Sequence, residues 1–163
     1  MNITIDLLIP PIIIALLIGM IFSTNALVME STVENRLSYE LQSTANTVLT
    51  VIEQEVRGIK EIVNLETDQL QFIDAASDTV TIFRDEMSMM VETSSAPGSP
   101  EQYNARLYEL NFDLAGVTGS PPILRVSIIT ESRAEQEVGT RPNRYRAVSE
   151  RDIYLRNLHI AQL

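Results

Sequence analysis

The chain has no cysteine and only one histidine, His159, among its 163 residues. Without cysteine it can form no disulfide, no cysteine-ligated zinc site and no thiol nucleophile. One histidine cannot supply a multi-histidine metal centre, and no recognisable nucleophile motif accompanies it for Ser-His-Asp catalysis. A Gly-rich phosphate-binding loop is also missing. We therefore expect no enzyme activity and no cofactor.

Positive charge is scarce as well. The chain carries 12 Lys and Arg against 22 Asp and Glu, a net charge of −10. This balance argues against general nucleic-acid binding, which depends on neutralising phosphates. The charge is also uneven, because residues 30–124 carry 5 Lys or Arg against 16 acids, whereas residues 125–163 carry 7 Arg against 5 acids. Such asymmetry either sets the register between neighbouring copies or simply solubilises a late loop.

The most prominent feature that is present is an apolar run near the N-terminus. Residues 7–29 contain no charged side chain and are bracketed by Asp6 and Glu30. A bilayer core needs roughly 20 apolar helical residues, so this stem is long enough to span a membrane. The run exceeds the roughly 7–15 apolar residues of a signal peptide, and no Lys or Arg precedes it, so we expect no cleavage after it.

Two places in the stem predict an irregular helix. Pro10 and Pro11 lie about one turn into it, so the regular helix either begins near them or is kinked there. Gly19 and the polar run 23–25 form a second weak point, because polar side chains compete for backbone groups. A local break is expected at one of these places.

Beyond the stem the apolar residues recur every three or four positions, which predicts one face of a helix. We expect one helix from about Leu7 to about Lys60, and its length of roughly 80 Å far exceeds the thickness of a bilayer. No heptad with regular flanking charges stands out, so a sheet is the expected partner rather than a coiled coil. The packing residues of this face are expected to include Leu37, Leu41, Val48, Ile52, Val56 and Ile59.

The rest of the chain predicts a small antiparallel sheet. Apolar alternation or short apolar runs predict strands in residues 69–74, 79–86, 87–91, 107–114, 124–128 and 152–158. Residues 94–100 and 116–122 are loops by composition. The polar segment 131–146 is expected to be an exposed loop. The predicted fold class is α+β, with a hydrophobic-to-amphipathic helix packed on an antiparallel sheet and three parts, 1–29, 30–62 and 63–163.

Three groups of side chains could have a functional role, but a structural role is preferred for each. Four acids near strand turns could ligate Ca²⁺ but lack the spacing of a dense oxygen-ligand site, so a solvated acidic face is preferred. Three methionines are expected in the core or a subunit interface. The arginine-rich segment 141–146 is expected to be solvated or to pair with acids rather than to touch DNA or glycans. The acids are Asp74, Asp78, Asp85 and Glu86, and the methionines are Met87, Met89 and Met90.

Asp6 is the most informative single residue. A carboxylate at the end of an apolar stem is costly in lipid or in a dry bundle unless it has a partner. It lies near a helix N-terminus, where free N–H groups favour an anion. It is therefore either an ordinary cap at the membrane surface or the partner of the α-amino group of an adjacent subunit.

This layout resembles the type IV pilin superfamily, including its minor pilins and pseudopilins. Those proteins have an acid at the fifth position of the mature chain, a hydrophobic half-helix and an amphipathic half-helix packed on a small antiparallel sheet. Asp6 is fifth if the mature chain begins at Asn2, although the family's usual residue is Glu and its helix-breaking proline lies later. Residues 41–62 resemble the second half-helix, and residues 152–158, with Arg156 and Asn157, resemble the final strand.

The resemblance implies a structural subunit of an extracellular pilus-like filament. The subunit would be held in the inner membrane by its stem, then polymerise with copies of itself through the action of pilus or secretion machinery. Asp6, Pro10, Pro11 and Gly19 are the expected assembly residues. The alternative is a single-pass membrane-anchored protein whose extracytoplasmic domain binds a ligand or partner.

Overall fold

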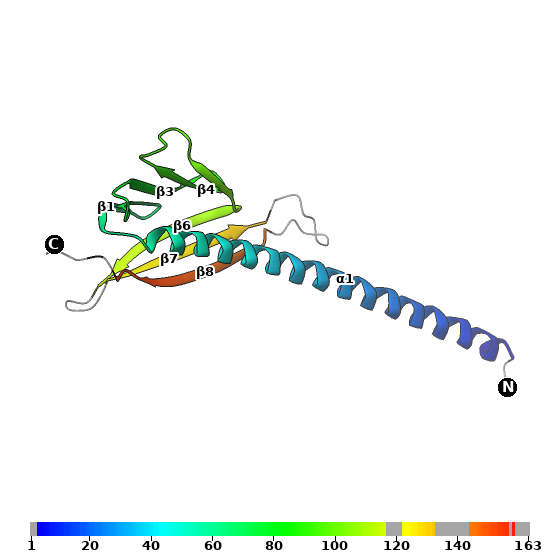
Figure 1. Ribbon diagram of the computed structural model, residues 1–163. Coiled ribbons are helices and arrows are strands. Elements are labelled where there is room, and N and C mark those ends of the chain that lie inside the picture. Colours follow the sequence, from blue (N-terminus) through cyan, green and yellow to red (C-terminus); the bar gives the residue numbers. More distant parts are fainter. Residues whose placement is uncertain (1–2, 117–121, 133–143, 157, 159–163) are drawn as a thin grey trace.

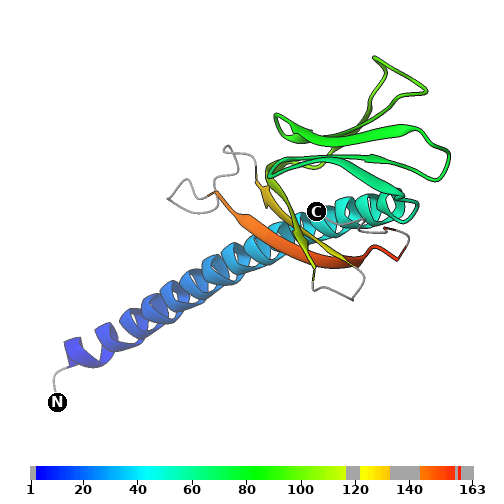
Figure 2. The same ribbon diagram turned by 90° about the vertical axis from the view of Figure 1, so that its left-hand side faces the viewer.

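One long N-terminal helix carries two antiparallel sheets near its C-terminal end (Figure 1). The computed structural model describes residues 3–116, 122–132, 144–156 and 158, with side chains from residue 10 onward in these ranges. The N-terminal part of the helix projects away from the sheets in both views (Figures 1 and 2). The fold is therefore α+β, as predicted, with an apolar stem outside the body that the sheets form. We call this body the head.

The helix α1 spans Ile3–Val56, 54 residues without interruption. At 1.5 Å per residue this is about 80 Å. Pro10 and Pro11 lie inside it, so the helix begins earlier than the prolines suggested. The break expected near residues 23–25 is not found, because the Thr24 hydroxyl donates to the carbonyl of Met20 at 2.9 Å and leaves the helix intact.

The two sheets are simple antiparallel meanders. The five-stranded sheet has the order β1-β2-β3-β4-β5 and the three-stranded sheet the order β6-β7-β8. The strands are β1 (Glu61–Glu66), β2 (Gln69–Ile73), β3 (Thr79–Asp85), β4 (Ser88–Thr93), β5 (Glu101–Asn104), β6 (Leu107–Ala115), β7 (Ile123–Glu131) and β8 (Arg146–Tyr154). Five of the predicted strands correspond to β2, β3, β4, β6 and β7.

Strands β1 and β5 were not predicted, and both lie at the edges of the five-stranded sheet. Each is mostly exposed, with the sequences EIVNLE and EQYN. Edge strands are commonly polar, which protects them from pairing with other chains. These two strands therefore lack the alternation of apolar residues on which strand prediction depends.

A final strand is present, but it lies earlier than the predicted residues 152–158 and shares only residues 152–154 with them. Strand β8 begins at Arg146 and ends at Tyr154, so Arg156 lies beyond it, and Asn157 is outside the described residues. The two end residues of the predicted loop 131–146 belong to strands, because β7 ends at Glu131 and β8 begins at Arg146. The reason is that Ser149 and Arg151, which face the helix, break the apolar alternation between Ala147 and Ile153.

The helix packs on the three-stranded sheet, against β7 and β8, while β6 faces the five-stranded sheet through β1, β2 and β3. One hydrophobic core joins the three layers. The backbone N–H of Leu107 donates to the carbonyl of Met87, and that of Phe112 donates to Thr67, so hydrogen bonds also tie the sheets together. The residues expected to pack this face are all at most 4% exposed: Leu37, Leu41, Val48, Ile52, Val56 and, just after the helix, Ile59.

We expect Ile52→Ala to lower the free energy of unfolding of the head by about 2–5 kcal/mol, because Ile52 is fully buried and its removal leaves a cavity. Ile18→Ala is the matched control, since Ile18 lies in the stem and is 48% exposed. The measurement is unfolding of the full chain in detergent, followed by the near-ultraviolet circular dichroism of its tyrosines. Equal destabilisation by the two substitutions would contradict this division between stem and head.

Candidate functional site

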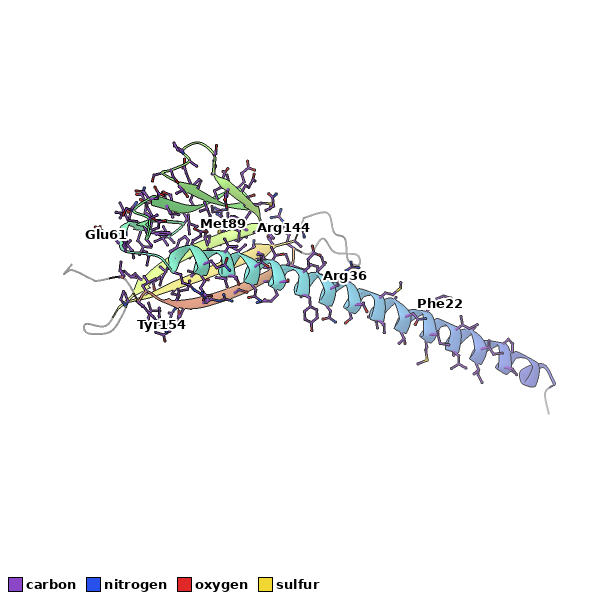
Figure 3. All side chains as sticks on the ribbon, in the orientation of Figure 1. Phe22, Arg36, Glu61, Met89, Arg144 and Tyr154 are labelled. Carbon is purple, nitrogen blue, oxygen red and sulfur yellow. The ribbon has the colours of Figure 1, made fainter. Side chains whose placement is uncertain are left out.

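The candidate site is the exposed apolar stem together with the contacts that fix it to the head. Every side chain from Pro10 to Val33 is exposed, and Phe22 and Met29 reach 71% and 72%. The helix is long and apolar enough to cross a membrane by length and composition, and its apolar part makes no buried contact within the described chain. The side chains stand clear of the head in Figure 3.

The stem is apolar on all sides rather than on one stripe. Residues 12–14, 16–18, 20 and 21 are all large and apolar, and successive side chains are turned by about 100° around the helix. Removing one such side chain from water is favourable by roughly 1.5–3 kcal/mol. For the twelve exposed large side chains between Ile12 and Met29, the summed free energy is at least as large as the net free energy of folding of a typical domain. The stem therefore requires an apolar environment on every side.

The structure places the predicted assembly residues on this stem. Asp6 lies in the first turns of α1, but its side chain is outside the described residues, so its pairing stays a prediction. Pro10 and Pro11 are exposed within the helix. A Cβ atom added to Gly19 would meet nothing within 4 Å. Packing within the chain therefore gives no reason for glycine at position 19.

Where the helix reaches the head, a series of polar contacts fixes its position. The Tyr145 hydroxyl donates to Glu34 at 2.9 Å, and Arg106 pairs with Glu40 at 3.3 Å. At the next residue, Leu41, the backbone carbonyl accepts a hydrogen bond from the buried Thr130 hydroxyl at 3.2 Å. These contacts come from segments that are far apart in the sequence. They set the direction in which the stem leaves the head.

Further along, Arg151 of β8 ties the last turns of the helix to the sheet. Its Nη1 atom donates to Glu53 at 2.8 Å and to the Thr50 hydroxyl at 3.4 Å. Arg57 also pairs with Glu53, at 3.3 Å. These hydrogen bonds from Arg57 and Arg151 lower the pKa of Glu53 below the ordinary value of a glutamate.

Glu55, two residues away, is in the opposite situation. Burial raises its pKa, and the nearby carboxylates of Glu101 and Asp74 add to the effect. The Tyr103 hydroxyl donates to Glu101 at 2.8 Å. The end of the helix thus carries one favourably and one unfavourably placed carboxylate.

A buried carboxylate that the sequence did not indicate lies at the end of β7. Glu131 is 4% exposed, and its carboxylate pairs with Arg146 at 3.0 Å and with Arg144 at 3.9 Å. Arg146 also stacks on Tyr108, with its guanidinium carbon 3.6 Å from the ring centre. The hydrogen bond to Glu131 raises the pKa of Arg146. Nothing in the polar segment 131–146 distinguished this glutamate from its solvated neighbours.

The other groups considered in the sequence do not form a chemical site in the described part of the chain. Asp74 and Asp78 cap one turn, where Asp74 accepts from the backbone N–H of Asp78, whereas Asp85 and Glu86 lie at the opposite end of β3. No group of three or more potential metal ligands is found among the described residues. Met89 is buried in the core, Met90 is half-buried and Met87 is exposed. His159 and residues 141–143 lie outside the described residues.

Comparison of the chain with protein-family models, with curated proteins and with solved structures finds no match.

The two glutamates predict opposite effects on stability. Because the folded-state pKa of Glu53 is lowered, its contribution is present above the unfolded-state pKa (about 4.3) and is lost as the pH falls through the folded-state value. At neutral pH, Glu53→Gln should therefore lower the free energy of unfolding, by less than about 1 kcal/mol for this partly exposed ion pair.

Because the folded-state pKa of Glu55 is raised, its charge destabilises the fold above that pKa, so Glu55→Gln should raise the stability at neutral pH. Both effects should disappear in acid, where the wild-type carboxyls are protonated. Chemical denaturation of the full chain in detergent at neutral and acidic pH measures both. Effects of the same sign at neutral pH would refute the assignment.

Proposed function

We propose that this chain is a structural subunit of an extracellular pilus-like filament, held in the membrane by its stem before assembly and polymerised through that stem afterwards. The observation that carries the proposal is the rigid continuity of α1. One helix of 54 residues is an apolar rod at one end and the fixed spine of a folded head at the other. Moving such a stem moves the head with it.

The stem suits two environments in turn. Residues 7–29 span roughly 35 Å as a helix, which matches a bilayer core of about 30 Å. Because the same side chains are apolar on every side, a bundle of parallel stems also covers them completely. Lipid already removes the stem from water, so packing between stems, pairing of Asp6 and the assembly machinery must favour the filament.

The position of the head supports this proposal over a simple anchor. From Pro10 onward, where the side chains are described, the first buried residue of the helix is Leu37, so the exposed segment continues past Glu30 before the head begins. A membrane anchor needs no such spine, because a flexible linker would serve equally well. The contacts at Glu34, Glu40 and Leu41 instead hold the stem in one orientation relative to the head. A fixed orientation is what a regular helical array requires.

The alternative, a single-pass protein with a ligand-binding head, uses the same stem. It differs in its final state, since the protein would remain in the membrane as separate molecules. Material sheared from the cell surface and viewed by negative-stain microscopy, with an antibody against the head, distinguishes the two. Labelled fibres support the filament. Recovery of the protein only in the membrane fraction supports the alternative.

Asp6→Ala should block or strongly slow filament assembly while leaving the head folded, because a bundle of stems would then lack the proposed partner of the α-amino group. Asp6→Glu, which keeps the carboxylate, is the matched control and should retain assembly. Fibre yield in the sheared fraction is the measurement, with unfolding of the head as the check on folding. Normal fibre yield from Asp6→Ala would remove Asp6 from the assembly mechanism.

A further inference from the structure

Between Tyr39 and Gln54 most of the side chains on the solvent-facing side of the helix are polar and uncharged, in a protein that is otherwise strongly acidic. The helix lies on the sheet with one side, and its other side is uncovered (Figures 1 and 3). The exposed residues on this uncovered side recur at helical spacing, and we call them the helix ridge: Tyr39, Ser43, Asn46, Thr47, Thr50 and Gln54. Residues 41–52 contain no charged side chain at all.

Two of the acids that border the ridge are paired with cations of the head, while Arg36, one turn before Tyr39, is an exposed charge at the N-terminal end of the ridge. Glu40 pairs with Arg106, and Glu53 pairs with both Arg151 and Arg57. Partnered charges at the border weaken the electrostatic field over the ridge. The ridge is therefore a surface of low charge about four turns long.

The hydroxyls of the two ridge threonines donate hydrogen bonds within the helix. Thr47 donates to the carbonyl of Ser43 at 2.9 Å, and Thr50 donates to the carbonyl of Asn46 at 2.8 Å. A hydroxyl that keeps its hydrogen bond when water leaves costs much less to bury than one that loses it. Tyr39, 78% exposed, borders a shallow hollow whose floor is formed by Gln42, Ser43, Asn46, Thr47 and Thr50. The ridge can thus be covered at a low cost in desolvation.

The five-stranded sheet offers no comparable surface for a second copy. Residues 61–104 carry Arg84 as their single cation and nine acids, namely Glu61, Glu66, Asp68, Asp74, Asp78, Asp85, Glu86, Glu92 and Glu101. Two copies that met through this sheet would repel each other. The neutral ridge is where like-charged copies can approach most closely.

Continuity with the stem identifies the occupant. The ridge begins ten residues beyond Met29 on the same uninterrupted helix, about 15 Å further along. Helices that pack beside a stem at the usual 8–10 Å between axes continue past it along the same line. We infer that the ridge is a docking surface for the helix of a second copy of this chain, which extends the contact between stems into the heads. This inference rests on the proposed function.

Labelling of single cysteines tests it, because the chain contains no cysteine of its own. Ser43→Cys reports on the ridge, Ala15→Cys on the stem, and Ser95→Cys, in the exposed turn after β4, on the outer head. The rate of reaction with a bulky maleimide is compared between sheared fibres and the same protein dispersed in detergent. This comparison needs no assumption about the stagger between copies.

In fibres we expect the ridge and stem cysteines to react at least about tenfold more slowly than in dispersed protein, because labelling then requires the interface to open. Ser95→Cys should react at nearly the same rate in both states. A protected Ala15→Cys together with a fully reactive Ser43→Cys would overturn the ridge while leaving the filament intact. Failure of the unmodified chain to form fibres would overturn both proposals.

A matched pair of charge substitutions provides a second test. Ser43→Asp places a charge on the ridge and should reduce fibre yield at low salt, with partial recovery at high salt as repulsion between copies is screened. Ser95→Asp adds the same charge away from the ridge and should leave the yield unchanged. Unfolding of the two dispersed variants checks that both heads are intact. Equal fibre yields from the two variants would argue against the ridge.

Discussion

The structure depends on one constraint, which is that the stem cannot face water. The side chains between Pro10 and Val33 are exposed on every side of the helix, and those before Glu30 are mostly large and apolar. Nothing in the described head folds back over them. Their cover must come from outside the chain, from lipid or from other copies. Because one helix joins stem and head, whatever covers the stem also fixes where the head stands.

The head is built to hold that helix firmly. Leu41, Ile52 and Val56 bury one face of it against β7 and β8. Polar contacts then fix its rotation and its direction, most clearly the hydrogen bond from Thr130 to the Leu41 carbonyl and the ion pair between Arg151 and Glu53. Such directional contacts add little stability but specify one arrangement. The opposite face carries mostly uncharged polar side chains between Tyr39 and Gln54, while nine acids and one cation lie in residues 61–104, so charge is distributed unevenly between the helix and the five-stranded sheet.

Sequence reasoning succeeded where one residue type dominates a face. The spacing of Leu37, Leu41, Val48 and Ile52 predicted both the helix and its buried side. It failed where polar residues take structural positions. The edge strands β1 and β5 have no apolar alternation, and in β8 the polar residues Ser149 and Arg151 interrupt it. Buried Glu131 could not be predicted, because its partners come from a different strand. The proposed partner of Asp6 belongs to another copy, which the structure of one chain does not contain.

The central claim is that the stem's final environment is a bundle of other stems. Electron cryomicroscopy of the sheared surface material tests it most directly. The account predicts fibres in which parallel stems fill the centre about 8–10 Å apart, with the heads outside and the helix ridge facing a neighbouring copy. Recovery of the native protein only as separate molecules in the membrane, with no fibre containing it, would contradict the account.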